Sequence, residues 1–289
     1  MVKRLSLPIP GGFNFRSTVY SHGWAELLPF ELDIEKWTLS YAFMGAEGCP
    51  VKGTMSEGKD RVNVRLQSDD IDTKKVLRDV RHILRLDDDL TGFYEMLSRH
   101  DHLNWVETKF AGRLLRSPTV WEDLVKTMCT TNCSWALTKI MTRNLVEKLG
   151  AGGRAFPTAE AMAGRDEAFY RAEIKAGYRS PYFIELADAV ASGQFDPESW
   201  LNSPLTGPEL RKEMKKVKGV GDYAADNLLK LVGKYDGLAL DSWLRSQFYK
   251  KYNNGKPCKD SKIERHYKKY GDWRGLVIWC DMTEKWIAG

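Results

Sequence analysis

The chain has 289 residues, of which 43% are hydrophobic and 29% charged, and its formal net charge is +5. This length fits one large domain or two closely joined ones, and the composition excludes a disordered, collagen-like or coiled-coil protein. No apolar run approaches the roughly 18 residues of a membrane span. The first residues lack the apolar core of a secretory signal, so we expect a cytoplasmic protein, or a nuclear one in a cell with a nucleus. The five cysteines are scattered and odd in number, which favours reduced thiols over a disulfide framework: Cys49, Cys129, Cys133, Cys258 and Cys280.

The first third of the chain shows the alternation of apolar and polar residues that is typical of half-buried strands. The alternation is clearest over residues 37–44 and 61–67. Gly45, Gly53 and Gly58 are among the residues that mark turns between them. Strands separated by short turns predict an antiparallel sheet.

From about Asp72 the apolar spacing becomes helical, as at Val76, Val80 and Ile83. Capping residues and loop signals then divide the remaining chain into helices. The predicted helices cover about 73–85, 89–99, 118–128, 133–149, 167–175, 180–192, 208–216, 222–233, 241–251, 261–270 and 273–286. Strands followed by a long run of helices predict an α+β fold.

The densest basic stretch of the sequence lies at residues 249–269. It contains Lys250, Lys251, Lys256, Lys259, Lys262, Lys268 and Lys269. A solvated helix face is the default interpretation of such a stretch, and contact with phosphate groups is the second.

Residues 216–230 contain a Gly-Val-Gly turn between two predicted helices, formed by Gly219, Val220 and Gly221. Glycine tolerates positive φ and close backbone approach, so two short helices can meet tightly there. The second helix would then present its first N–H groups outward, as a site for an anion such as a phosphate. An ordinary helix–helix corner explains the same pattern, so the turn alone is a weak signal.

About twenty residues after this turn, Asp241 follows the apolar residues Leu238, Ala239 and Leu240 and begins a predicted helix. The position is that of an N-cap, whose side chain accepts a hydrogen bond from the first turn. A purely structural cap is one interpretation. The other is a carboxylate that stabilises positive charge on a reacting substrate.

The hairpin followed by this aspartate resembles the helix-hairpin-helix (HhH-GPD) superfamily of DNA glycosylases. Four further blocks, at residues 13–19, 86–94, 113–132 and 176–182, resemble in order the 3-methyladenine glycosylase II and 8-oxoguanine glycosylase branches, with 13–19 matching the first strand of their sheet. The resemblance covers about residues 12–286. It implies a TBP-like antiparallel sheet over residues 1–85 and a helical body over 86–289, with the hairpin at 210–233.

The resemblance also implies roles for individual residues. Asp241 would be the catalytic carboxylate, stabilising the oxocarbenium-like sugar as the base departs and helping water to attack. The hairpin residues Gly219, Val220 and Gly221 would contact the DNA backbone. Tyr178 would be a wedge that fills the space of the flipped base, Arg179 would contact the orphaned base, and Asn132 would enter the duplex from another loop.

Bifunctional members of the superfamily carry a lysine nucleophile two residues after the second hairpin glycine, where this chain has Tyr223. We therefore expect a monofunctional enzyme without lyase activity. The residues expected to line the lesion pocket are Tyr223, Trp243, Asn227 and Trp24. Aromatic walls favour electron-poor, cationic alkylated purines. An 8-oxoguanine-type glycosylase and a non-catalytic DNA-damage binding protein remain open alternatives.

The expected partner is damaged double-stranded DNA, with no membrane involved, and the expected protein is a monomer of the nucleoid, or of the nucleus. No iron–sulfur cluster is expected, because only Cys258 and Cys280 follow the catalytic aspartate. No histidine or cysteine spacing indicates another metal site. By family resemblance, the hairpin carbonyls near Val217 and Val220 are a candidate site for a monovalent cation.

Overall fold

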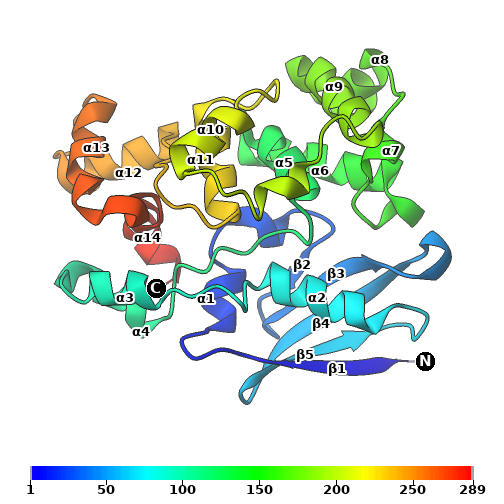
Figure 1. Cartoon of the computed structure of the whole chain (residues 1–289), viewed down its shortest axis with the longest axis horizontal. Helices are drawn as coiled ribbons and strands as arrows, with labels where there is room; N and C mark the ends of the chain where they lie inside the picture. The colour runs from blue at the N-terminus through cyan, green and yellow to red at the C-terminus, as the bar shows by residue number, and fades with distance from the viewer. Residues whose placement is uncertain (1, 288–289) are drawn as a thin grey trace.

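The computed structural model describes residues 2–287, so the expected domain limits at residues 1 and 289 lie outside the described residues. An antiparallel sheet occupies one side of the molecule and helices form the rest (Figure 1). The strands are β1 (Lys3–Pro8), β2 (Glu31–Asp33), β3 (Thr38–Met44), β4 (Pro50–Gly58) and β5 (Arg61–Leu66). Their order is β1-β5-β4-β3-β2, and every neighbouring pair is antiparallel. The predicted α+β class is confirmed.

The alternation over residues 61–67 corresponds to β5, in which Val62, Val64 and Leu66 are buried and the residues between them are exposed. Gly53, which the sequence placed in a turn, lies inside β4 opposite Tyr41. A Cβ atom at this position would lie 2.7 Å from the Phe43 ring. The glycine therefore makes room for an aromatic side chain in the sheet and does not break the strand.

Residues 13–19 were expected to form the first strand, and this prediction is wrong. They contain helix α1 (Phe15–Val19), and the first strand is β1. The Asn14 side chain accepts a hydrogen bond from the Ser17 N–H at 2.9 Å, which is an N-cap. Phe15 and Val19, four residues apart, are fully buried, so a helical turn places both in the core.

The helices after the sheet follow the predicted order. Their bounds are α2 (Thr73–Ile83), α3 (Thr91–Leu97), α4 (Asn104–Thr108), α5 (Val120–Thr130), α6 (Trp135–Leu149), α7 (Ala159–Met162), α8 (Glu167–Phe169), α9 (Ser180–Ala191), α10 (Gly207–Met214), α11 (Asp222–Leu231), α12 (Ser242–Tyr252), α13 (Asp260–Tyr267) and α14 (Arg274–Ile287). The short helices α4 and α7 were not predicted. None of the helices within residues 2–287 combines the length and the apolar character needed to cross a membrane.

The hydrophobic interior has three parts. One lies between the sheet and helices α1 and α2, and it also takes in Leu115 and Leu231 from the helical body. A second is formed mainly by α5, α6, α9, α10 and α11. The third joins α3 and α4 to α12, α13 and α14. Leu115 and Leu231 thus fix the sheet against the segments that carry the site.

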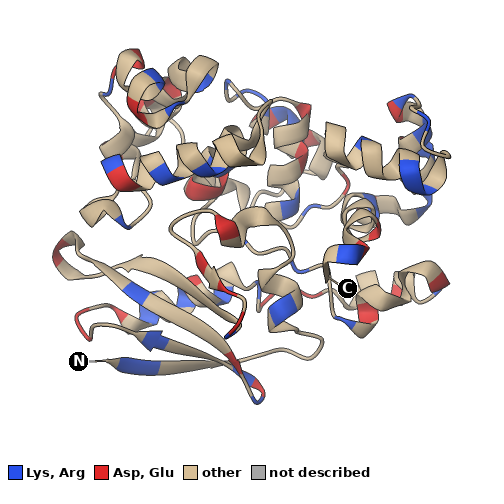
Figure 2. Ribbon diagram, turned by 180° about the vertical axis from the view of Figure 1, so that it is seen from behind, with Lys and Arg blue, Asp and Glu red and all other residues tan. Residues whose placement is uncertain are grey.

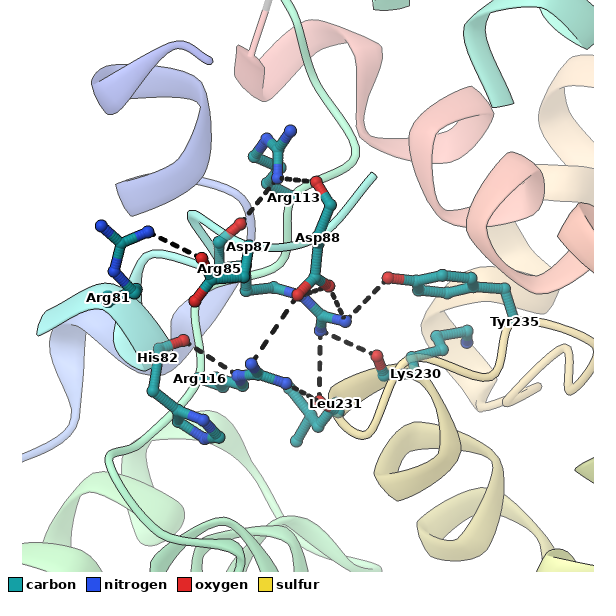
Figure 3. Close-up of polar contacts among 10 residues, drawn as sticks. All are labelled: Arg81, His82, Arg85, Asp87, Asp88, Arg113, Arg116, Lys230, Leu231 and Tyr235. Atoms are coloured by element: carbon teal, nitrogen blue, oxygen red, sulfur yellow. Dashed lines mark hydrogen bonds and ion pairs between the residues drawn. The ribbon is translucent and has the colours of Figure 1, made fainter. Parts of the chain in front are cut away.

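A buried arginine joins these parts (Figure 3). Arg85 follows α2, is 1% exposed, and donates through Nε to Asp88 Oδ2 at 2.6 Å. Its Nη1 atom donates to the carbonyl oxygens of Lys230 at 2.9 Å and Leu231 at 3.2 Å, and Nη2 donates to the Tyr235 hydroxyl at 2.8 Å. A guanidinium at the C-terminus of α11 satisfies carbonyl groups that the helix leaves free and complements its dipole.

Two further arginines surround Arg85 (Figure 3). Arg113 Nη1 donates to the Arg85 carbonyl at 2.6 Å and to the Asp88 carbonyl at 2.7 Å. Arg116 donates through Nε to the His82 carbonyl at 2.9 Å and through Nη1 to the Leu231 carbonyl at 3.1 Å. The end of α2, the segment before α5 and the end of α11 are therefore held in one polar cluster.

Replacing Arg85 with Met should lower the free energy of unfolding by about 3–5 kcal/mol, because Asp88 and two helix carbonyls lose their buried donor. Chemical denaturation followed by circular dichroism measures this loss. Arg81→Met is the matched control, since Arg81 pairs with the exposed Asp87 and should contribute less than about 1 kcal/mol. Equal losses in the two variants would contradict the role assigned to Arg85.

Candidate DNA-binding and active site

The Gly-Val-Gly turn connects α10 to α11 as the sequence predicted. Gly219 has φ +90°, and a Cβ atom there would lie 2.9 Å from the Tyr182 ring and 3.0 Å from the Met128 methyl group. Val220 is 4% exposed and anchors the turn in the core. Gly221 is the N-cap of α11, has no side-chain cap and faces open space. The first N–H groups of α11 are therefore available to an external anion.

Helix α11 also supports the loop that leads to Asp241. Asp226 accepts the Arg211 guanidinium through one oxygen and the Ala239 N–H, at 3.1 Å, through the other. Lys230 Nζ donates to the Leu238 carbonyl at 3.2 Å. Ala239 has φ +53°, a conformation that costs energy for a residue with a side chain. These two contacts from one face of α11 hold that turn in place.

Asp241 is the N-cap of α12, and its Oδ1 atom accepts the Leu244 N–H at 2.7 Å. The N-cap prediction is confirmed. Its Oδ2 atom forms no hydrogen bond or ion pair with the residues that the structure describes. The side chain lines a cavity of about 560 Å³. One carboxylate oxygen is thus fixed by the helix, and the other remains available at the cavity.

The expected pocket residues come together around this cavity. Tyr223 and Asn227 line it from α11, Trp243 from α12 and Trp24 from the segment that precedes β2. The Trp24 Nε1 atom donates to Asp123 Oδ1 at 2.7 Å, so the indole N–H is used within the protein. Further walls that the sequence did not indicate come from Tyr20, Trp135, Trp279 and Trp286. Trp243 and Trp286 are near neighbours, with ring centroids 4.7 Å apart.

Several titratable groups at the cavity have shifted pKa values. Burial and the nearby Asp241 raise the pKa of Tyr223 to about 12. Burial lowers the pKa of Lys230 to about 8, against the opposing effect of Asp226 and Asp241. Burial also lowers the pKa of His22 to about 4, and its Nε2 atom lies 2.6 Å from the Leu115 carbonyl. His22 is therefore neutral near pH 7, with the proton on Nε2.

Lys230 and His22 were not among the predicted site residues. No local pattern indicates that either side chain lies at the cavity, because that depends on how α11 and the segment before β2 pack together.

Tyr178 and Asn132 lie together on the surface. Neither lines the cavity, but Thr130 and Cys133, on either side of Asn132 in the chain, do. Tyr178 is 45% exposed, and its hydroxyl lies 3.3 Å from Asn132 Nδ2 and 3.3 Å from Thr131 Oγ1. Two loops distant in sequence thus place an exposed aromatic ring beside an amide. The wedge role that the resemblance implies for Tyr178 stays a prediction.

Arg179 lies differently from its expected place. It is 3% exposed, and its Nε atom donates to the Met128 carbonyl and to Thr131 Oγ1, both at 3.1 Å. Its guanidinium carbon lies 4.5 Å from the centre of the Tyr178 ring. In this structure the guanidinium lies beneath the surface and connects the loop that carries Tyr178 to the loop that carries Asn132. It does not point outward. Direct contact with an orphaned base stays a prediction.

Within residues 2–287 no group of three His, Cys, Asp or Glu side chains is placed to hold a metal ion. At the hairpin, the Val217 carbonyl accepts the Val220 N–H at 3.0 Å. One of its lone pairs is therefore used in the turn. The monovalent cation stays a prediction, and no step below depends on it.

Gly219→Ala should destabilise the protein by about 1–3 kcal/mol, since alanine is strained at this φ and its methyl group would press on Tyr182 and Met128. Gly221→Ala is the control, because its backbone is extended and its surroundings are open. It should cost less than about 1 kcal/mol. Denaturant titration of both variants measures the difference, and similar losses would contradict the assigned close packing.

Comparison with known proteins shows that this fold is shared with solved DNA glycosylases. The structure aligns with 3-methyladenine DNA glycosylase from Archaeoglobus fulgidus with a TM-score of 0.74 and 17% identity, over 97% of this chain and 98% of that one. It aligns with the Clostridium acetobutylicum 8-oxoguanine glycosylase/lyase, in complex with double-stranded DNA containing cytosine opposite 8-oxoguanine, with a TM-score of 0.72 and 20% identity, over 99% and 97% of the chains.

At the level of sequence the similarity is lower. The curated DNA-3-methyladenine glycosylase of Bacillus subtilis (strain 168) is 26% identical over 167 residues, which is 54% of each chain. The match therefore spans about half the length of that relative. No protein-family model matches the sequence. These similarities establish the fold.

Proposed function

We propose that this protein is a base-excision-repair DNA glycosylase, which flips a damaged purine out of the duplex and hydrolyses its N-glycosidic bond. The observation that carries the proposal is the Asp241 carboxylate, which is fixed through one oxygen and presents the other to an aromatic-walled cavity. The fold shared with DNA glycosylases and the open N-terminus of α11 support it. We also expect a monomer that acts wherever the DNA lies, in the nucleoid or the nucleus.

The proposed reaction uses the geometry directly. The hairpin binds a phosphate through the N–H groups of α11, and Tyr178 fills the space left by the flipped nucleotide. As the base departs, positive charge develops on the sugar, and the free oxygen of Asp241 stabilises it. Water then adds to the sugar carbon, giving the free base and an intact abasic strand.

For the substrate we favour alkylated purines. Trp24, Tyr223 and Trp243 present rings to the cavity, and the Trp24 N–H is already bound to Asp123, so this indole offers mainly its face. Stacking and cation–π attraction on such rings suit an electron-poor, positively charged base. Asp241 adds negative charge at the same cavity.

The Lys230 ammonium favours the second candidate, a neutral lesion such as 8-oxoguanine. Lys230 is buried at the same cavity, where its positive charge disfavours the binding of a base that also carries a positive charge. A panel of duplexes that carry 3-methyladenine-type, 7-methylguanine, hypoxanthine, uracil or 8-oxoguanine lesions decides between the two. Tight binding without release of any base would instead indicate a damage-binding protein.

Asp241→Asn should lower base excision by roughly 100-fold or more, because the charge that stabilises the sugar cation is lost. Folding and DNA affinity should be kept, since asparagine caps a helix about as well as aspartate. Single-turnover base release, measured beside duplex affinity and a melting curve, tests this. Near-wild-type excision by the variant would refute the assignment.

We further propose that the enzyme is monofunctional, because Tyr223 stands at the position of the superfamily's lysine nucleophile. The product strand should break only after hot alkali, and borohydride should trap no protein–DNA adduct, since trapping needs a Schiff base. Lys230→Met is the control variant for the trapping experiment, because the Lys230 amine lies at the cavity. An adduct that disappears in Lys230→Met would overturn the proposal and identify that lysine as a nucleophile.

A further inference from the structure

The positive charge of this protein is concentrated in one short segment. Residues 249–269, here called the basic segment, contain eight lysine and arginine side chains against two acidic ones, a net charge of +6. The whole chain carries +5, so the other 268 residues together carry −1. The end of α12, the turn after it, α13 and the two lysines that follow α13 therefore account for the entire positive excess.

These side chains are placed on the surface. All eight lysines and arginines of the basic segment are exposed. Five of them form no ion pair or side-chain hydrogen bond with the residues that the structure describes: Lys250, Lys256, Lys259, Arg265 and Lys268. Of the acidic neighbours, Asp260 pairs with Arg245, which precedes the segment, and Asp281 and Glu284 pair with Lys251.

Surface lysines elsewhere in the chain are commonly paired. Lys215, Lys216 and Lys218 at the hairpin each contact a carboxylate at 2.5 to 2.6 Å. Unpaired charges of one sign repel each other when they lie close together, so a mixed pattern is what a merely soluble surface needs. Clustered and unpaired basic residues are the electrostatic signature of a polyanion-binding face.

The position of the segment relates it to the proposed site. Helix α12 begins directly after Asp241, and its C-terminal end is the start of the basic segment. In Figure 1, α13 lies along the same upper side of the molecule as the hairpin helices α10 and α11 and as α9, which begins two residues after Tyr178, whereas the sheet lies on the lower side. Figure 2 shows lysine and arginine segments at α12 and α13 from behind. A rod-shaped duplex laid along this side would run beside α9, the hairpin helices and the basic segment.

We propose that the basic segment is a second DNA contact, which binds backbone phosphates of the duplex outside the lesion. The inference rests on the proposed function. It adds a contact with the duplex outside the lesion to the contacts at the pocket. Such contacts carry no sequence information. They hold the enzyme on undamaged duplex and orient the strand at the cavity.

The test compares two triple variants of equal charge change. Lys256→Gln, Lys259→Gln and Lys268→Gln together remove three unpaired charges of the basic segment. Lys59→Gln in the β4–β5 turn, Arg65→Gln in β5 and Lys74→Gln in α2 serve together as the control. They remove three exposed charges that form no ion pair with any residue from 2 to 287. Affinity for an undamaged 30-base-pair duplex and for a 10-base-pair duplex centred on a lesion is measured against salt concentration.

On the long duplex, the basic-segment variant should lose about 0.9 in the slope of log affinity against log salt for each phosphate contact removed, about two to three in total. On the short duplex its slope should equal that of the wild type, and the single-turnover excision rate at saturating DNA should not change. The control variant should keep the wild-type slope on both duplexes.

Equal slopes for the two variants on the long duplex would overturn the inference. An equal loss on both duplexes would also overturn it, because the contacts would then lie within the lesion site. If the wild type binds neither duplex, the proposed function itself fails, and this outcome is distinguishable from the other two.

Discussion

The arrangement of the whole molecule depends on one buried cation. The Arg85 guanidinium lies where the helix after the sheet, the segment before α5 and the C-terminus of α11 meet, and it donates to groups from α11 and the loop beyond it. Helix α11 carries Tyr223, Asn227 and Lys230 at the cavity, while Trp24 comes from the sheet side. A contact that lies outside the cavity therefore holds the α11 wall in place, together with the packing of Leu115 and Leu231 against the sheet.

Local rules predicted much of the fold. The period-2 pattern located β3 and β5, and capping residues placed most of the helices within a few residues. Residues 13–19 were assigned by resemblance to a strand, although an Asn14 cap and a Phe15–Val19 pair indicate a helical turn. Strand β4 was missed because Gly53 suggests a turn, and the Phe43 and Leu66 side chains on the two neighbouring strands explain that glycine.

The site residues also differ in whether neighbouring residues in the sequence predict them. Asp241 as an N-cap and the Gly219–Gly221 turn follow from neighbours in sequence, so the sequence was sufficient for them. The burial of Arg179 and the presence of Lys230 and His22 at the cavity depend on contacts between segments some fifty or more residues apart, such as Arg179 with Met128 and His22 with Leu115. Such contacts leave no local periodicity. The five predicted residues that meet at the cavity were found through family resemblance and not through spacing.

The aromatic wall of the cavity has an optical consequence. Five of the ten tryptophans of the chain line it: Trp24, Trp135, Trp243, Trp279 and Trp286. Indoles that stack on an inserted base lose emission and change their exposure to water. The intrinsic fluorescence of the unlabelled protein should therefore report, in real time, when a nucleobase enters and leaves, without a dye on either the protein or the DNA.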